Sequence, residues 1–382
     1  MRDSVVSKNL RSDQDEAPTP PPIHGNPCRY TNWPPHLAQL VLITLTLLIG
    51  FGLLLDYPEL GNLATSAETE EEKGDIALYR TVVKRMRAGE SFYVATGEEQ
   101  HLKGYATTPF LTWRLPTLAW LIATLGEIPM ANILRVLAGL AMLVWIQSLK
   151  DQGFKRRGTI LGVLLVYSSL VIVMPPTTVY LHEAWAATLI AFSLALWQRF
   201  WRLSVLFGIA ALAFRELALP YVLAMAVCAA WEGHWREVVG WVLGTSLFLI
   251  GITWHASIVN PLIQPHALQG GGWLALGGWA FVLSANQLNI IILALGQWLT
   301  AFWVPLALIG AGSSAGPLGN RLLLIVGGYT LAFLFAGRPD NNYWGIIYGP
   351  LIAVSLTFMP LGLSALWSAA RWSQWFHRST SS

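Results

Sequence analysis

Eleven apolar segments recur along the chain, and they constrain its fold more than any other feature. Only 12% of the 382 residues are charged, about half the share in a soluble globular domain. The surplus apolar side chains therefore need a solvent other than water, which a lipid bilayer supplies. This composition excludes a soluble globular enzyme and a disordered chain. The segments lie near 37–55, 109–126, 131–149, 158–174, 183–198, 203–214, 217–231, 238–256, 288–310, 321–336 and 345–366.

Segment 109–126 is the least suited to cross a membrane, because Arg114 and two prolines leave about ten clean apolar residues. If it instead lies along the outer interface, or dips into the membrane and returns, every short basic loop falls in the cytoplasm, in line with the positive-inside tendency. The chain is then an all-α polytopic membrane protein with about ten transmembrane helices and both termini inside. We expect a disordered cytoplasmic tail over 1–36, a transmembrane domain over 37–366 and a cytoplasmic C-terminal tail over 367–382.

The first outer loop, residues 56–130, is too long for a simple turn, and such loops are usually functional or disordered. Within it, the stretch 74–89 predicts an amphipathic helix beside the membrane surface. Apolar residues recur there at helical spacing, basic residues line another face, and a glycine follows as a typical helix stop. The apolar residues are Tyr79, Val82, Val83 and Met86, and the basic ones are Arg80, Lys84 and Arg87.

Asp75 stands at the N-terminus of this expected helix, and two interpretations of it remain open. It is either an N-cap, a common use of aspartate, or a catalytic carboxylate held at the boundary between water and lipid. The basic face has two interpretations as well. Arg80 and Lys84 either rest on anionic headgroups or bind the phosphate of a lipid substrate.

Several ionisable residues in or near apolar runs fall on the outer side in this orientation. Burying such groups near lipid is costly, so their common edge predicts a shared polar cavity. For two of them, His266 and Asp340, ordinary loop polarity explains the position equally well. The full set is Asp75, His182, Glu183, Arg215, Glu216, His266, Arg338 and Asp340.

The order of these features resembles the GT-C superfamily of integral-membrane glycosyltransferases, which use polyprenyl-phosphate sugars. The likeness covers most of 37–366 and consists of short motifs on one side of the membrane. The motifs are the long outer loop with Asp75, Tyr79 and Gly89-x-x-x-Tyr93, Arg135 opening a span, His182-Glu183-Ala184-Trp185, Phe214-Arg215-Glu216-Leu217-Ala218-Leu219-Pro220, and Gly337-Arg338-Pro339-Asp340-Asn341-Asn342-Tyr343-Trp344 before a last span.

The resemblance implies that Asp75 is the general base of a sugar transfer to an acceptor hydroxyl on the outer face of the plasma (inner) membrane. The chemistry then suits Arg215 or Arg338 to the leaving phosphate, because a guanidinium donates two parallel hydrogen bonds and stays charged. The partners would be a polyprenyl-phosphate sugar, an acceptor glycan, lipid or protein, and the bilayer. The candidate substrate-binding residues are His182, Glu183, Arg215, Glu216, Arg338 and Tyr343, with Arg80 and Lys84 for a phosphate or headgroup.

Two other classes of function compete with the enzyme: a transporter or lipid-linked sugar flippase, and a non-catalytic membrane subunit. Transporters usually have paired halves and polar residues near the middle of the membrane. The chain has no such repeat, and its ionisable residues crowd one edge, which favours the enzyme. A net charge of +3 without a basic block gives no case for nucleic acid. No spacing typical of metal ligands indicates a metal cofactor, and Cys28 and Cys228 do not support a disulfide.

Overall fold

The computed structural model describes residues 28–56, 74–264, 268, 270 and 275–371, and every regular element within them is helical. The α-helices are α1 (Pro35–Leu54), α2 (Asp75–Arg87), α3 (Phe92–Leu102), α4 (Thr117–Leu125), α5 (Glu127–Asp151), α6 (Arg156–Leu170), α7 (His182–Leu196), α8 (Trp201–Phe214), α9 (Leu219–Trp231), α10 (Trp235–Val259), α11 (Gly278–Ala285), α12 (Ile290–Leu295), α13 (Thr300–Ser313), α14 (Pro317–Phe335) and α15 (Gly349–Ala370). Short 3-10 helices join them: η1 (Phe110–Thr112), η2 (Val171–Val173), η3 (Pro176–Tyr180), η4 (Glu216–Ala218), η5 (Asn260–Leu262), η6 (Gln297–Leu299) and η7 (Pro339–Ile347).

Six of these helical stretches are long and apolar enough to cross a bilayer, counting only the described residues. They are α1, α5, α6 with η2, α10 with η5, α14 and α15. This confirms the prediction of a helical membrane protein that crosses the bilayer several times. α4 has nine residues and rises only about 13 Å, so it does not cross a hydrocarbon core of about 30 Å by itself.

Four expected spans correspond to shorter helices. α7, α8, α9 and α13 have 15, 14, 13 and 14 residues, which gives each a rise of only about 20 Å. The expected continuous span over 288–310 is wrong in detail, because the chain forms α12, a break and then α13. The break falls at Gly296, whose φ of 115° no other residue adopts easily.

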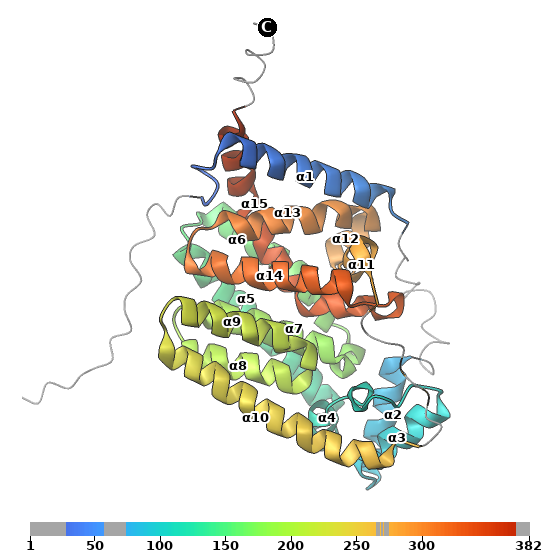
Figure 1. The fold of residues 1–382 in the computed structure, drawn as a ribbon. Helices are drawn as coiled ribbons and strands as arrows, with labels where there is room; N and C mark the ends of the chain where they lie inside the picture. The colour runs from blue at the N-terminus through green and yellow to red at the C-terminus, as the bar shows by residue number, and fades with distance from the viewer. Residues whose placement is uncertain (1–27, 57–73, 265–267, 269, 271–274, 372–382) are drawn as a thin grey trace, which may run out of the picture.

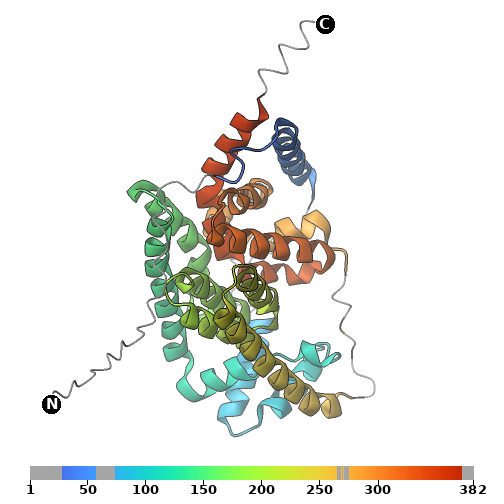
Figure 2. The same cartoon turned by 60° about the vertical axis from the view of Figure 1, so that its left-hand side comes forward.

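The helices form one bundle in which α1, α13, α14, α9, α8 and α10 lie side by side (Figure 1). Both views place α1 and the end of α15 on one flank, and the group of α2, α3 and α4 on the other (Figures 1 and 2). In Figure 1 the α9–α10 and α13–α14 turns lie at one end of the helices, while the α2–α4 group lies toward the other. The bundle therefore has two distinct ends.

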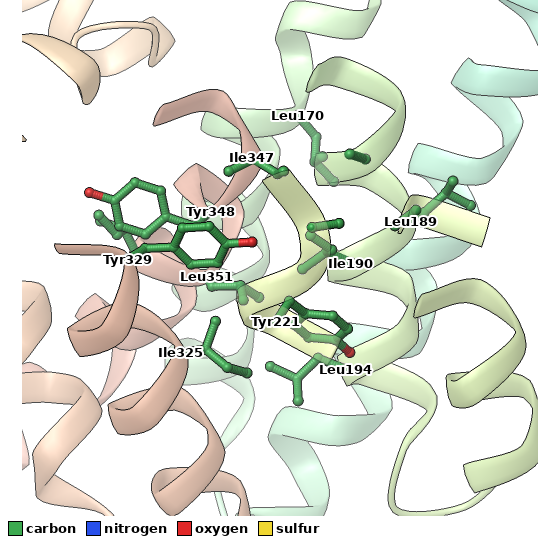
Figure 3. Close-up of a cluster of buried hydrophobic side chains, with 14 of the residues drawn as sticks. Leu170, Leu189, Ile190, Leu194, Tyr221, Ile325, Tyr329, Ile347, Tyr348 and Leu351 are labelled. Carbon is green, nitrogen blue, oxygen red and sulfur yellow. The ribbon is translucent and has the colours of Figure 1, made fainter. Parts of the chain in front are cut away.

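α7 is the central helix of the bundle, and all 15 of its residues are buried. It contacts α5, α6, α8, α15 and η7. Five of its residues are alanines, and small side chains allow neighbouring helices to approach closely. Larger side chains fill the space between α7 and its neighbours, as in the cluster of Leu189, Ile190 and Leu194 with Tyr221, Ile325 and Leu351 (Figure 3).

The expected disorder of residues 1–36 does not hold from Cys28 onward; residues 1–27 lie outside the described residues. Tyr30 is buried and its hydroxyl donates to the Ile309 carbonyl at 3.3 Å. The Arg29 backbone N–H donates to the Ser313 carbonyl at 2.7 Å. This short segment is therefore packed on the end of α13, because its tyrosine has a buried partner there. At the other terminus, α15 runs through Ala370, four residues into the expected tail, and 372–382 lie outside the described residues.

The contact between α13 and α15 should be sensitive to a single methyl group. A Cβ added at Gly310 would lie 1.9 Å from the Ser355 carbonyl oxygen, so Gly310→Ala forces these helices apart. We expect it to lower the free energy of unfolding by about 1–3 kcal/mol or more. Thermal unfolding in detergent measures the loss. Gly327→Ala, in α14 with open space around its Cβ position, is the matched control and should be neutral or slightly stabilising.

Candidate active site

α2 confirms the predicted amphipathic helix and positions Asp75. Its buried face includes Leu78 and Val82, and Lys84 is exposed on another side. Asp75 is the first helical residue, and Gly74 occupies the N-cap position. The N-cap interpretation of Asp75 is therefore wrong. Its carboxylate instead accepts a hydrogen bond from the Tyr343 hydroxyl, with Oδ2 and the hydroxyl oxygen 3.1 Å apart.

A buried ion cluster lies where α7 begins and where α8 gives way to α9. The Arg215 Nε atom is 2.7 Å from Glu183 Oε1, and a second nitrogen of Arg215 pairs with Glu216. The side chains of Arg215 and Glu183 are only 1% and 3% exposed. Glu216 also pairs with Arg114, whose Nη1 is 3.7 Å from Glu216 Oε1. Three segments far apart in the sequence therefore meet through their charges.

Local sequence explains why the cluster forms at this point. α8 ends at Phe214, and Arg215 has an extended backbone with φ −149° and ψ 117°. Pro220 stands in the first turn of α9, where proline is tolerated, and its ring would clash inside a continuous helix. At the break Arg215 is extended, and Glu216 begins the 3-10 helix η4. Trp185 stacks on Phe214 with ring centroids 5.0 Å apart, which holds the start of α7 beside the end of α8.

Arg114 of the ion cluster contacts two tyrosines, and one of them, Tyr343, connects the cluster to Asp75. Arg114 Nε donates to the Tyr79 hydroxyl at 3.0 Å, and Arg114 Nη2 donates to the Tyr343 hydroxyl at 3.5 Å. Tyr343 in turn donates to Asp75. Burial raises the pKa of both Tyr79 and Tyr343, so both phenols keep their protons at neutral pH. Tyr343 therefore acts as a hydrogen-bond donor that orients the Asp75 carboxylate.

His182 joins the site through its contact with Tyr79. The two rings meet edge to face, with centroids 4.9 Å apart and an angle of 73° between their planes. The histidine is buried, and its Nδ1 atom has no hydrogen-bond partner among the described residues. The side chain thus presents an unused polar atom to the interior.

The charges of the connected network do not favour an anion. Asp75, Glu183 and Glu216 contribute three carboxylates, against the two guanidinium groups of Arg114 and Arg215. Both arginines already contact carboxylates, so they are poorly placed to receive a phosphate. Arg215 is better described as a group that holds Glu183 and Glu216 in position.

The remaining predicted residues lie apart from this network or beside it. The Arg80 guanidinium lies over the Tyr180 ring, 5.6 Å from its centroid. Arg80 Nε is buried without a hydrogen-bond partner among the described residues. Arg338 is half-buried at the N-cap of η7, five residues before Tyr343. His266 and the side chain of Asp340 lie outside the described residues.

The sequence analysis missed three residues of this region as site candidates. Arg114 is central to the network. Its sequence signal was the same as that of Arg215, a charge within an apolar run. Tyr105 lies near Asp75, and burial raises the pKa of the Tyr105 phenol. His255, near the end of α10, contacts the Tyr93 hydroxyl through Nδ1 at 3.2 Å. The sequence feature that could have singled out His255 is a histidine within an otherwise apolar helix.

The described residues contain no group of three or more histidine, cysteine or acidic side chains arranged to hold a metal ion. Comparison of the chain with known protein families, with curated proteins and with solved structures finds no match. The function must therefore be argued from the geometry of this site.

Proposed function

We propose that the chain is a membrane glycosyltransferase that moves a sugar from a polyprenyl-phosphate donor to an acceptor hydroxyl, with Asp75 as general base. The observation that carries this proposal is the position of Asp75. It is a partly exposed carboxylate at the start of α2, oriented by Tyr343, which is itself held by Arg114 of the buried ion cluster. A carboxylate fixed in this way can accept the proton that the acceptor loses as the glycosidic bond forms.

The leaving phosphate needs a cation that is not already neutralised. Arg80 lies on α2 with Asp75 and has a buried Nε atom with no hydrogen-bond partner among the described residues. Lys84 is exposed one turn further along the same helix. We assign the phosphate to these cations rather than to Arg215. In the reaction the bond between the sugar and the phosphate breaks, the acceptor oxygen bonds to the sugar, and the acceptor proton passes to Asp75.

The proposed membrane arrangement has about ten crossings, both termini inside and Asp75 outside, in the plasma membrane. Its support is the distribution of charge between the two ends of the bundle. Arg199 lies in the α7–α8 turn and Arg236 in the first turn of α10, and the start of α10 lies at the end opposite to the α2–α4 group (Figure 1). The short helices α8 and α9 would then hold Arg215 and Glu216 below the membrane surface, in a recess that excludes water and strengthens charge interactions.

The test is a transfer assay with the purified full-length chain in proteoliposomes. Polyprenyl-phosphate hexoses and pentoses labelled in the sugar are supplied with a fraction of membrane lipids and glycans as acceptors. We expect label to appear in a covalent product. Movement of label across the bilayer without a new covalent product would instead establish the transporter or flippase.

A further inference from the structure

A groove of about 440 Å³ lies between the α2–α3 turn and α4. Its size falls within the range of small-molecule sites. Three aromatic side chains line it together with polar ones. These six lining residues are Arg87, Glu90, Ser91, Phe92, Tyr93 and Trp120. Trp120 is 43% exposed, so a ring face is available to a bound molecule.

A second, smaller cavity lies on the other side of Phe92. In this conformation it has about 20 Å³, enough for one water molecule. Its walls are mainly apolar, with Leu118 and Ile122 on the α4 side, and it reaches Arg114 and His182 of the candidate active site. Phe92 lines both spaces and is only 6% exposed. The groove and the inner cavity, which leads to the site, therefore share Phe92 as a wall.

α3 presents two unpaired polar atoms on the face that carries Phe92. Thr96 and Gln100 follow Phe92 at intervals of four residues and line the inner cavity. Both are buried, and Thr96 Oγ1 and Gln100 Oε1 have no hydrogen-bond partner among the described residues. Gln100 Nε2 already donates to the Thr112 carbonyl at 3.2 Å, so the unsatisfied atom is an acceptor. A buried acceptor without a donor is costly, which favours a ligand that brings an O–H group.

We propose that the groove and the inner cavity are two halves of one acceptor site, closed here by Phe92, and that the acceptor is a neutral, hydroxyl-bearing amphiphile. This inference rests on the proposed function. The charged side chains of the groove already have partners: Arg87 donates to the Ile122 carbonyl at 3.0 Å, and Glu90 pairs with Arg85 at 2.6 Å. Aromatic rings suit the apolar faces of a sugar or polyol, and the aliphatic walls suit a chain.

The first test uses an octyl β-glucoside with a diazirine in its alkyl chain, and the same probe with every sugar hydroxyl methylated. Both are photo-crosslinked to the full-length chain in proteoliposomes, and the labelled residues are mapped by mass spectrometry. We expect the hydroxyl probe to label α3 and α4. Gln100→Leu should raise the concentration of the hydroxyl probe that gives half-maximal labelling about tenfold. It should leave labelling by the methylated probe unchanged. Gln198→Leu, at the opposite end of the bundle, is the matched control.

The second test concerns Phe92 as the barrier. Phe92→Leu should raise labelling of Leu118 and Ile122 several-fold, because a smaller side chain joins the two spaces. Leucine is chosen because Phe92→Ala would remove more of the packing that Phe92 forms with Leu78 and Val82. The leucine variant therefore keeps the fold while opening the barrier. Phe200→Leu, on an exposed phenylalanine elsewhere, should change nothing.

Three results would overturn the acceptor site. They are equal labelling by both probes, no labelling of α3 and α4, and displacement of the probe by polyprenyl phosphate without a sugar, which would identify the donor chain as the occupant. The two proposals fail separately. Loss of probe binding while sugar transfer continues refutes only the acceptor site, and intact probe binding without any covalent product refutes only the transferase.

Discussion

Asp75→Asn is expected to lower kcat for sugar transfer by about 10²- to 10⁴-fold, because an amide cannot take the acceptor proton. The change preserves the size of the side chain. Its carbonyl oxygen still accepts the hydrogen bond from Tyr343, which lies 3.1 Å from Asp75 in the parent. Thermal stability in detergent and KM for the donor should therefore stay close to the parent values. Initial rates at saturating donor in proteoliposomes measure the effect.

Asp56→Asn makes the same chemical change at an exposed position just after α1. It should retain parental turnover, because Asp56 lies outside the network that orients Asp75. Equal kcat values for the two variants would refute the assignment of Asp75 as the base. Loss of turnover accompanied by a lower melting temperature would point to a structural role for Asp75 instead.

The surface helix was the part of the fold that the sequence predicted best. α2 combines an apolar face with a basic face, and that periodicity is a local property of its 13 residues. The membrane helices are harder to delimit, because lipid-facing and core-facing residues are both apolar. α7 is buried on all sides and shows no polar face. The break at Gly296 was missed for a related reason, since a glycine between two apolar runs does not reveal its φ angle.

The sequence predicted part of the candidate site's residues, but not their roles. Glu183, Arg215 and Glu216 stand out because a charge in an apolar run is costly unless it is paired. Their pairing with one another depends on how α7 meets the α8–α9 break, which is a tertiary contact. Arg114 was noticed only as an obstacle to a membrane crossing. The same charge is what connects the ion cluster to the tyrosines.

Arg215→Gln is expected to lower the free energy of unfolding by about 3–5 kcal/mol, because it leaves the buried Glu183 carboxylate without its cation. The Glu183 side chain is 3% exposed, so water cannot screen its charge, whereas Glu216 is 21% exposed and keeps Arg114 as a partner. Titration with SDS in mixed micelles, followed by circular dichroism, measures the loss. The effect should exceed that of any single uncharged substitution at the surface of the bundle.

Arg199→Gln is the matched control, since Arg199 also pairs with a carboxylate, Asp151, at 2.8 Å but is 53% exposed. An exposed pair contributes about 0–1 kcal/mol, so this variant should unfold close to the parent. Adding Glu183→Gln to Arg215→Gln should restore part of the lost stability, because the unpaired buried charge is removed. If the two arginine variants are equally stable, or if the added glutamine restores nothing, the buried cluster does not hold this end of the bundle together. If the Arg215→Gln chain is stable but inactive, Arg215 contacts the leaving phosphate directly, contrary to the role inferred from its pairing with Glu183.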